Sequence, residues 1–135
     1  MTRTIDLLDT LIAWPTVSRT PNIALIEHAR DVLQAVGADC QIIAHESGER
    51  ANLYATIGPK ERPGVMLSGH TDVVPVEGQA WSRDPFKLYR ADGRLYGRGT
   101  ADMKGFVASA LAMAEKAGQR DLKTPLHIAL SYDEE

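Results

Sequence analysis

The sequence has almost no cysteine, no cluster of basic residues and no long apolar run. Its single cysteine, Cys40, excludes an internal disulfide framework and a cysteine-rich zinc knuckle. A nucleic-acid-binding surface needs a basic patch, whereas the formal net charge is -3 and no such patch is present. The apolar runs are too short to span a bilayer, and the first residues lack the apolar core of a signal peptide. We therefore expect no nucleic-acid or membrane partner and a reduced, cytoplasmic setting.

The composition is that of an ordinary globular protein. Hydrophobic residues make up 44% and charged residues 24% of the 135 residues, which argues against extensive disorder or a fibrous repeat. A chain of this length can bury roughly two thirds of the surface that it exposes when unfolded. Length and composition alone thus predict one small domain with a core of its own.

Apolar spacing and capping residues predict three helices. They are expected at residues 4–13, 20–36 and 102–117. The second helix is expected to begin with Thr20 as its cap and Pro21 at its first helical position. Gly37 and Gly118 are expected to end the second and third helices.

Strand patterns occur between the second and third helices and again after the third. They are expected at residues 39–45, 51–57, 64–69, 88–91, 94–96 and 125–132. The first two form a plausible hairpin, and Asp92-Gly93 is typical of a two-residue hairpin turn. The continuous apolar run at 64–69 predicts a strand buried on both faces. Strands interleaved with helices indicate an α/β fold with a mixed β-sheet flanked by helices.

Acidic and histidine residues lie next to three of these elements. His70 and Asp72 come directly after the apolar strand, and Glu134 and Glu135 follow the last strand. Asp102 lies at the start of the third helix. Ligands gather outside the carboxyl ends of the strands in α/β sheets, so we expect these side chains to converge there.

The residue types in this group fit a metal centre. Imidazole and carboxylate ligands without thiolates suit Zn²⁺ or a similar divalent ion. His70 and Asp72 project to the same side of an extended segment, where Asp72 can accept the hydrogen bond from the non-ligating nitrogen of His70. Adjacent Glu134 and Glu135 in extended geometry point in opposite directions, so one can bind metal while the other reaches water or substrate. A two-metal centre would relieve the repulsion among these carboxylates.

Each feature taken alone has a simpler interpretation. A His-x-Asp segment is more often a turn feature, and an isolated Glu-Glu pair is usually solvated. His127 alternates with apolar neighbours and is expected to have a packing role. Arg98 is expected to form an ordinary salt bridge, and Lys104 is expected to be solvated. The combination of acidic and histidine residues at strand ends and a helix start is what favours a site.

Three ordered segments resemble the signature motifs of the M20 zinc peptidase and deacylase family. They are residues 66–75 with Gly-His-Thr-Asp, residues 97–105 with Gly-Thr-Ala-Asp-Met-Lys, and residues 132–135 with Tyr-Asp-Glu-Glu. The resemblance implies a zinc-exopeptidase-like catalytic domain. Within the family, residues 81–86 and 99–106 are most similar to those of acetylornithine deacetylases. Succinyl-diaminopimelate desuccinylases, or another aminoacylase or dipeptidase of the family, are the alternative.

The resemblance also implies a role for each residue of the group. His70 would bind one metal ion, Glu135 would bind a second, and Asp102 would bridge both. Glu134 would be the general base, and Asp72 would orient His70. The implied cofactors are two divalent metal ions, expected to be zinc, with cobalt as the other candidate.

The reaction that the resemblance implies is hydrolysis of a small N-acyl amino acid, in the first place N-acetylornithine in arginine biosynthesis. Glu134 would take a proton from a metal-activated water and pass it to the leaving amine. By the same resemblance, the peptide bond between Asp102 and Met103 is expected to be cis.

The family pattern continues beyond the paired glutamates. It includes another acidic ligand, a lid and dimerisation domain, and a last histidine ligand. We therefore expect residues 1–135 to be the N-terminal part of an M20 catalytic domain, whose lid and C-terminal part are absent. The full-length protein would be a homodimer through the lid, and this chain alone is expected to have little or no activity. The alternative of another class is a non-catalytic truncated remnant.

Overall fold

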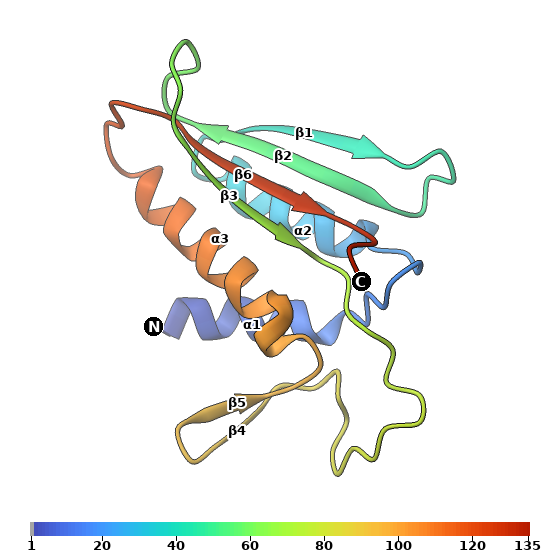
Figure 1. The fold of residues 1–135 in the computed structure, drawn as a ribbon. Helices are drawn as coiled ribbons and strands as arrows, with labels where there is room; N and C mark the ends of the chain where they lie inside the picture. The colour runs from blue at the N-terminus through green and yellow to red at the C-terminus, as the bar shows by residue number, and fades with distance from the viewer. Residues whose placement is uncertain (1) are drawn as a thin grey trace.

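The computed structural model describes residues 2–135, which form three long helices, a four-stranded sheet and a separate two-stranded hairpin (Figure 1). The helices are α1 (Thr2–Ala13), α2 (Ile23–Gln34) and α3 (Gly105–Ala117), and a short helical turn, η1 (Thr100–Lys104), leads into α3. The strands are β1 (Asp39–Ala44), β2 (Ala51–Ile57), β3 (Val65–His70), β4 (Tyr89–Ala91), β5 (Arg94–Tyr96) and β6 (Leu126–Ser131). No helix among residues 2–135 is long and apolar enough to cross a membrane.

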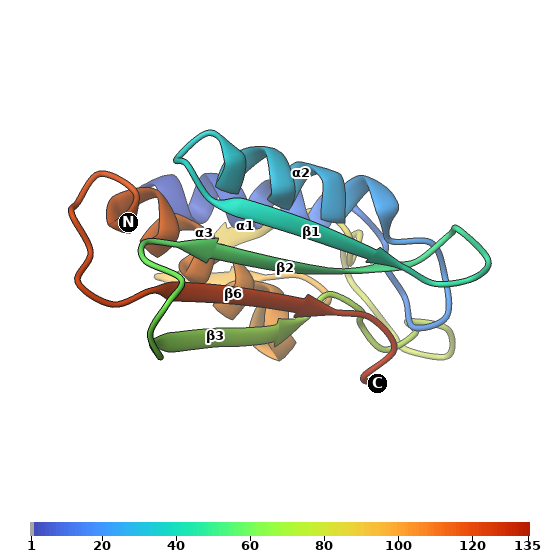
Figure 2. The ribbon, with the colours of Figure 1, turned by 90° about the horizontal axis from the view of Figure 1, so that it is seen from above.

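The main sheet is mixed, as the sequence predicts. Its strand order is β1-β2-β6-β3, which places the last strand of the chain between two earlier ones (Figure 2). β1 pairs with β2 and β2 pairs with β6 in antiparallel fashion, whereas β3 and β6 run parallel. The parallel pair brings the carboxyl ends of β3 and β6 to the same edge of the sheet.

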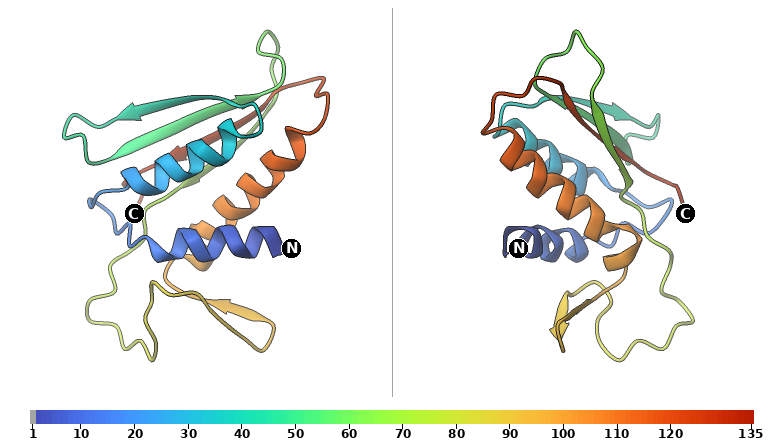
Figure 3. Two further views of the ribbon diagram at one scale, coloured as in Figure 1. Left: turned by 180° about the vertical axis from the view of Figure 1, so that it is seen from behind. Right: turned by 60° about the vertical axis from the view of Figure 1, so that its left-hand side comes forward.

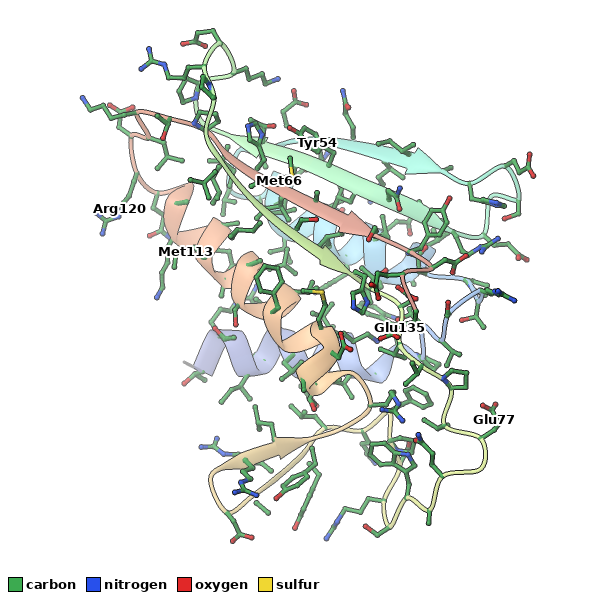
Figure 4. All side chains as sticks on the ribbon, viewed as in Figure 1. Tyr54, Met66, Glu77, Met113, Arg120 and Glu135 are labelled. Carbon is green, nitrogen blue, oxygen red and sulfur yellow. The ribbon has the colours of Figure 1, made fainter. Side chains whose placement is uncertain are left out.

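All three helices lie on one side of the sheet (Figure 3). Leu53 and Ala55 of β2, with Ile128 and Leu130 of β6, are buried on that side together with the apolar faces of the helices. The intervening residues face the other way, and Tyr54 and Met66 lie on the face turned from the helices (Figure 4). The α/β class is confirmed, with the helix-facing side of the sheet as the core.

The expectation that the strand at 64–69 is buried on both faces is wrong. β3 is an edge strand that pairs only with β6, and among the described residues no helix covers the outer face of the sheet. Val65 is therefore 60% exposed and Met66 is 50% exposed. Only the last two residues, Gly69 and His70, are buried, because α3 and the turn before it pack against this end.

The second helix begins later than the sequence indicates. α2 starts at Ile23 with Asn22 as its cap residue, rather than at Thr20 and Pro21. The Asn22 side chain does not cap the helix. Its amide instead donates to the Ala51 carbonyl at 3.0 Å and to the Thr71 hydroxyl at 3.1 Å, and its oxygen accepts from the Ala51 amide at 2.8 Å. Asn22 thus joins the start of α2 to β2 and to the segment that follows β3.

Lys104 is buried rather than solvated, which corrects the expectation from the sequence. The third helix begins at Gly105, and Lys104 precedes it with a side chain that is 1% exposed. The Lys104 Nζ donates to the carbonyl of Leu11 at 2.9 Å and to that of Trp14 at 2.6 Å. These carbonyls belong to the C-terminal end of α1, where a helix favours positive charge.

Burial of the Lys104 ammonium lowers its pKa from 10.5 to about 8. Between pH 8 and 10 the unfolded chain therefore binds more protons than the folded chain, and folding stability gains with rising pH. We expect this single group to add about 2 kcal/mol to the free energy of unfolding between those pH values. Urea unfolding of the wild type and of Lys104→Met at both pH values measures the difference, because the other titrating groups are common to both. An equal pH dependence in the two proteins would contradict the prediction.

Candidate metal centre

The predicted site residues come together at the shared carboxyl edge of β3 and β6. His70 is the last residue of β3 and lies opposite Ser131 in the parallel register. Glu134 and Glu135 come three and four residues after Ser131, and Glu135 lies close to the end of β3 (Figure 4). Asp102 reaches the same place from η1, where its backbone and that of Met103 are not helical.

The donor atoms of this group are close together. One donor atom each from His70, Glu134 and Glu135 lie within 4.8 Å of one another. The Nε2 atom of His70 is 2.9 Å from Asp102 Oδ1 and 3.6 Å from Glu134 Oε2. The imidazole is buried, whereas the Asp102 and Glu134 side chains are 74% and 61% exposed. The site is therefore a buried imidazole at the base of an open group of carboxylates.

Hydrogen bonding sets the orientation of His70. Its Nδ1 atom donates to the backbone carbonyl of Asp72 at 2.9 Å, and this bond directs Nε2 towards the carboxylates. The pKa of His70 is raised above its ordinary value. Burial is the largest single influence and lowers this pKa. The hydrogen bonds to the Asp72 carbonyl and the Asp102 carboxylate, together with the negative charges of Asp72 and Glu134, outweigh burial. The surroundings of Nε2 thus favour a positive charge at that position, whether a proton or a metal ion.

The Asp72 carboxylate has different hydrogen-bond partners from those that the sequence predicts. Its carboxylate was expected to accept the hydrogen bond from His70, but that bond goes to the Asp72 carbonyl, and the carboxylate Oδ1 is 3.4 Å from Nδ1. The Asp72 carboxylate instead accepts the backbone N–H of Glu134 at 3.1 Å and that of Glu135 at 2.9 Å. Asp72, which is 3% exposed, therefore orients His70 through its backbone and both glutamates through its side chain.

The paired glutamates also differ from the expectation. In an extended strand, consecutive amides point to opposite sides, and so do consecutive side chains. Here β6 ends at Ser131, Asp133 has a left-handed backbone with φ of 55°, and both glutamate amides donate to the one Asp72 carboxylate. Glu134 and Glu135 consequently direct a carboxylate oxygen each towards His70 rather than in opposite directions.

The charges of the group match a bound cation. Within residues 2–135, the carboxylates of Asp102, Glu134 and Glu135 form no ion pair with a lysine or arginine side chain. Partial burial, followed by repulsion from Asp102, raises the pKa of Glu135, and the nearby His70 only partly offsets this. One imidazole nitrogen among several carboxylate oxygens is a donor set that suits zinc or a similar ion. The residues present therefore fit the predicted metal.

Other contacts complete the surroundings of the site. The peptide bond between Asp102 and Met103 is cis, as expected, and the Met103 sulfur accepts the backbone N–H of His70 at 3.3 Å. His127, on the outer face of the sheet, lies 2.8 Å from the Thr56 hydroxyl through Nδ1, in line with a packing role. Arg98 forms no salt bridge among the described residues, contrary to expectation, and it donates to the Gln79 side chain.

The family model for Peptidase family M20/M25/M40 matches residues 66–135, which contain all of these site residues. The chain belongs to this family. It is 40% identical over 138 residues to an acetylornithine deacetylase from Pasteurella multocida and 38% identical to one from Shigella sonnei, in each case with 97% of this chain aligned. Among solved structures, human carnosine dipeptidase 1 superposes with a TM-score of 0.79 at 27% identity, over 96% of this chain and 31% of that chain.

The chain spans only about a third of the length of these relatives, since the alignments cover 36% of each deacetylase. The family that the three sequence motifs indicate is confirmed. The matched region begins at Met66, in β3, so the first motif lies at the start of the match and the paired glutamates lie at its end.

Proposed function

We propose that the chain is the N-terminal part of an M20 catalytic domain and that the full-length protein removes the acetyl group from N-acetylornithine. The observation that carries the proposal is the convergence of His70, Asp102, Glu134 and Glu135 at one sheet edge. The 40% identity to an acetylornithine deacetylase supports the choice of substrate. Hydrolysis would add one water to the amide and release acetate and the free amino group.

In this proposal His70 would hold one divalent ion through Nε2, Glu135 would hold a second, and the Asp102 carboxylate would serve both. We propose zinc as the metal, with cobalt as a substitute. When bound, such ions supply an activated water and polarise the substrate carbonyl. Asp72 holds His70 and the two glutamates in position relative to one another. Its carbonyl accepts a hydrogen bond from His70 Nδ1, and its carboxylate accepts hydrogen bonds from the backbone amides of Glu134 and Glu135.

Glu134 is proposed to hold and move the proton. Its carboxylate is largely exposed and lies 3.6 Å from His70 Nε2, so it can face both water and a substrate that enters from the open side. It would accept a proton from the attacking water and deliver that proton to the departing amine nitrogen. Because water is the nucleophile, no serine or cysteine is needed.

The donor count indicates that the site needs further ligands. A catalytic zinc site has about three protein ligands besides water, and two such ions need more donors than His70, Asp102 and Glu135 provide. We propose that the remaining ligands, and a lid through which two copies pair, lie in the other two thirds of a protein as long as the relatives. The 135-residue chain alone is then expected to bind metal weakly and to show no hydrolysis.

The test is to read the coding DNA past Glu135 and to express the whole reading frame. Release of free amine is then measured with N-acetylornithine, N-succinyl-diaminopimelate and dipeptides, in the presence of Zn²⁺ or Co²⁺. We expect N-acetylornithine to have the highest kcat/KM, and the 135-residue chain to give no product. A higher value for another substrate would reject the deacetylase assignment, and a natural stop codon after Glu135 would support a non-catalytic remnant.

A further inference from the structure

Asp133 lies between β6 and the two site glutamates, and its backbone conformation decides where both of them point. Its φ of 55° is in the left-handed region, which few residues other than glycine adopt. Asparagine and aspartate tolerate this conformation better than other side chains, because they form local hydrogen bonds. The contacts of the Asp133 side chain therefore bear directly on this conformation.

Two groups from distant segments hold the Asp133 carboxylate. Its Oδ1 atom accepts the backbone N–H of Arg19 at 2.8 Å. Its Oδ2 atom forms an ion pair with the guanidinium of Arg50, which stands directly before β2. The side chains of Arg50 and Asp133 are 18% and 25% exposed, so this pair is better shielded from water than the other pairs of arginine or lysine with a carboxylate among residues 2–135.

Arg50 is itself fixed by its surroundings. Its guanidinium lies 5.4 Å from the ring centre of Tyr132, the residue before Asp133. Its carbonyl accepts the backbone N–H of His45 at 2.8 Å and closes the β1–β2 hairpin. Arg50 is therefore a cation directly before β2, where its guanidinium contacts Tyr132 and Asp133, the two residues that lead into the glutamate pair.

We propose that Arg50, through its ion pair with Asp133, is a positioning residue for Glu134 and Glu135. The pair keeps Asp133 left-handed, which turns both glutamate amides towards Asp72 and both carboxylates towards His70. The Ser18 hydroxyl supports the same turn by donating to the Glu135 carbonyl at 3.1 Å. The inference rests on the proposed function, because it gives Arg50 a role in the same metal site.

The experiment compares the 135-residue chain with its Arg50→Met and Arg50→Lys variants. The first readout is amide hydrogen exchange of Glu134 and Glu135 without metal, measured by NMR against the β6 amides of Ile128 and Leu130. We expect Arg50→Met to speed exchange at both glutamates by about tenfold while the β6 amides are unchanged, because only the turn opens. Arg50→Lys keeps the charge and is expected to restore part of the protection.

The second readout is the dissociation constant of Zn²⁺, measured by calorimetry. Loss of a group that orients metal ligands typically weakens metal binding by about 10–100-fold, and we expect Arg50→Met to fall in that range. Arg3→Met is the matched control, since Arg3 also pairs with a carboxylate, Glu115, but does so far along the chain from the site. This control is expected to change neither readout.

Asp133→Asn provides an independent variant that keeps a residue suited to the left-handed conformation but removes the charge that Arg50 meets. It is expected to match Arg50→Met. Wild-type exchange at Glu134 and Glu135 in either variant would overturn the inference, as would loss of protection throughout β6. Faster exchange in the variants, together with no Zn²⁺ binding by the wild type, would support the positioning role and reject the metal site.

Discussion

Replacing Glu134 by glutamine in the full-length protein is expected to lower kcat for N-acetylornithine by about 10²–10⁴-fold, the usual contribution of a general acid–base group. Glutamine has the same shape as glutamate but cannot accept and return a proton. The backbone N–H of residue 134 would still donate to Asp72, so the turn should keep its geometry. The bound metal content is therefore expected to stay at the wild-type value.

Glu135→Gln is the matched comparison. Both glutamates contribute a donor atom to the same group around His70, and their positions alone do not separate a ligand from a base. If Glu135 is the ligand, its variant should lose metal and regain activity when excess Zn²⁺ or Co²⁺ is added, whereas Glu134→Gln should not recover. Measuring kcat and the bound metal content of both variants tests this assignment. Loss of metal from Glu134→Gln would instead make Glu134 the ligand and Glu135 the general base.

Local sequence patterns predict the secondary structure well where residues adjacent in the sequence determine the backbone conformation. Asp92 and Gly93 both adopt positive φ, at 50° and 73°, as the two-residue turn between β4 and β5 requires. β2 likewise spans Ala51–Ile57, the residues that the sequence predicts as a strand. Burial of β3 could not be predicted in the same way, because it depends on which strands and helices lie beside it rather than on its own residues.

The candidate site also has features that the local sequence predicts and features that depend on tertiary contacts. His70, Asp102, Glu134 and Glu135 could be predicted to converge, since each lies beside the end of a strand or the start of a helix. Their relative orientation could not, because it depends on the left-handed turn at Asp133.

The supporting residues were missed for a related reason. Asn22 contacts Thr71 across 49 residues, Arg50 contacts Asp133 across 83, and Lys104 contacts Leu11 across 93. No local pattern marks such contacts. The only available signal was a weak one: a lysine two residues after the acidic residue of a motif, Asp102.

Replacing His70 by alanine is expected to weaken binding of Zn²⁺ to the 135-residue chain by at least about 100-fold, since the loss of an orienting group alone costs 10–100-fold. His70 supplies the one nitrogen atom in the donor group found among the described residues. Its Nδ1 bond to Asp72 also fixes the direction from which Nε2 approaches a metal. Alanine would remove both the ligand and this orientation.

The effect can be read as zinc-dependent stability, which separates metal binding from any change in the metal-free fold. At a free Zn²⁺ concentration of 100 times the wild-type Kd, a ligand that binds only the folded chain adds about 2.7 kcal/mol to its stability. A 100-fold weaker variant should gain only about 0.4 kcal/mol under the same conditions. His127→Ala is the control, because His127 lies on the outer face of the sheet, where its Nδ1 atom is 2.8 Å from the Thr56 hydroxyl, and it is not one of the residues of the donor group. Equal stabilisation of His70→Ala and the wild type would place the zinc elsewhere and remove the basis for the metal centre.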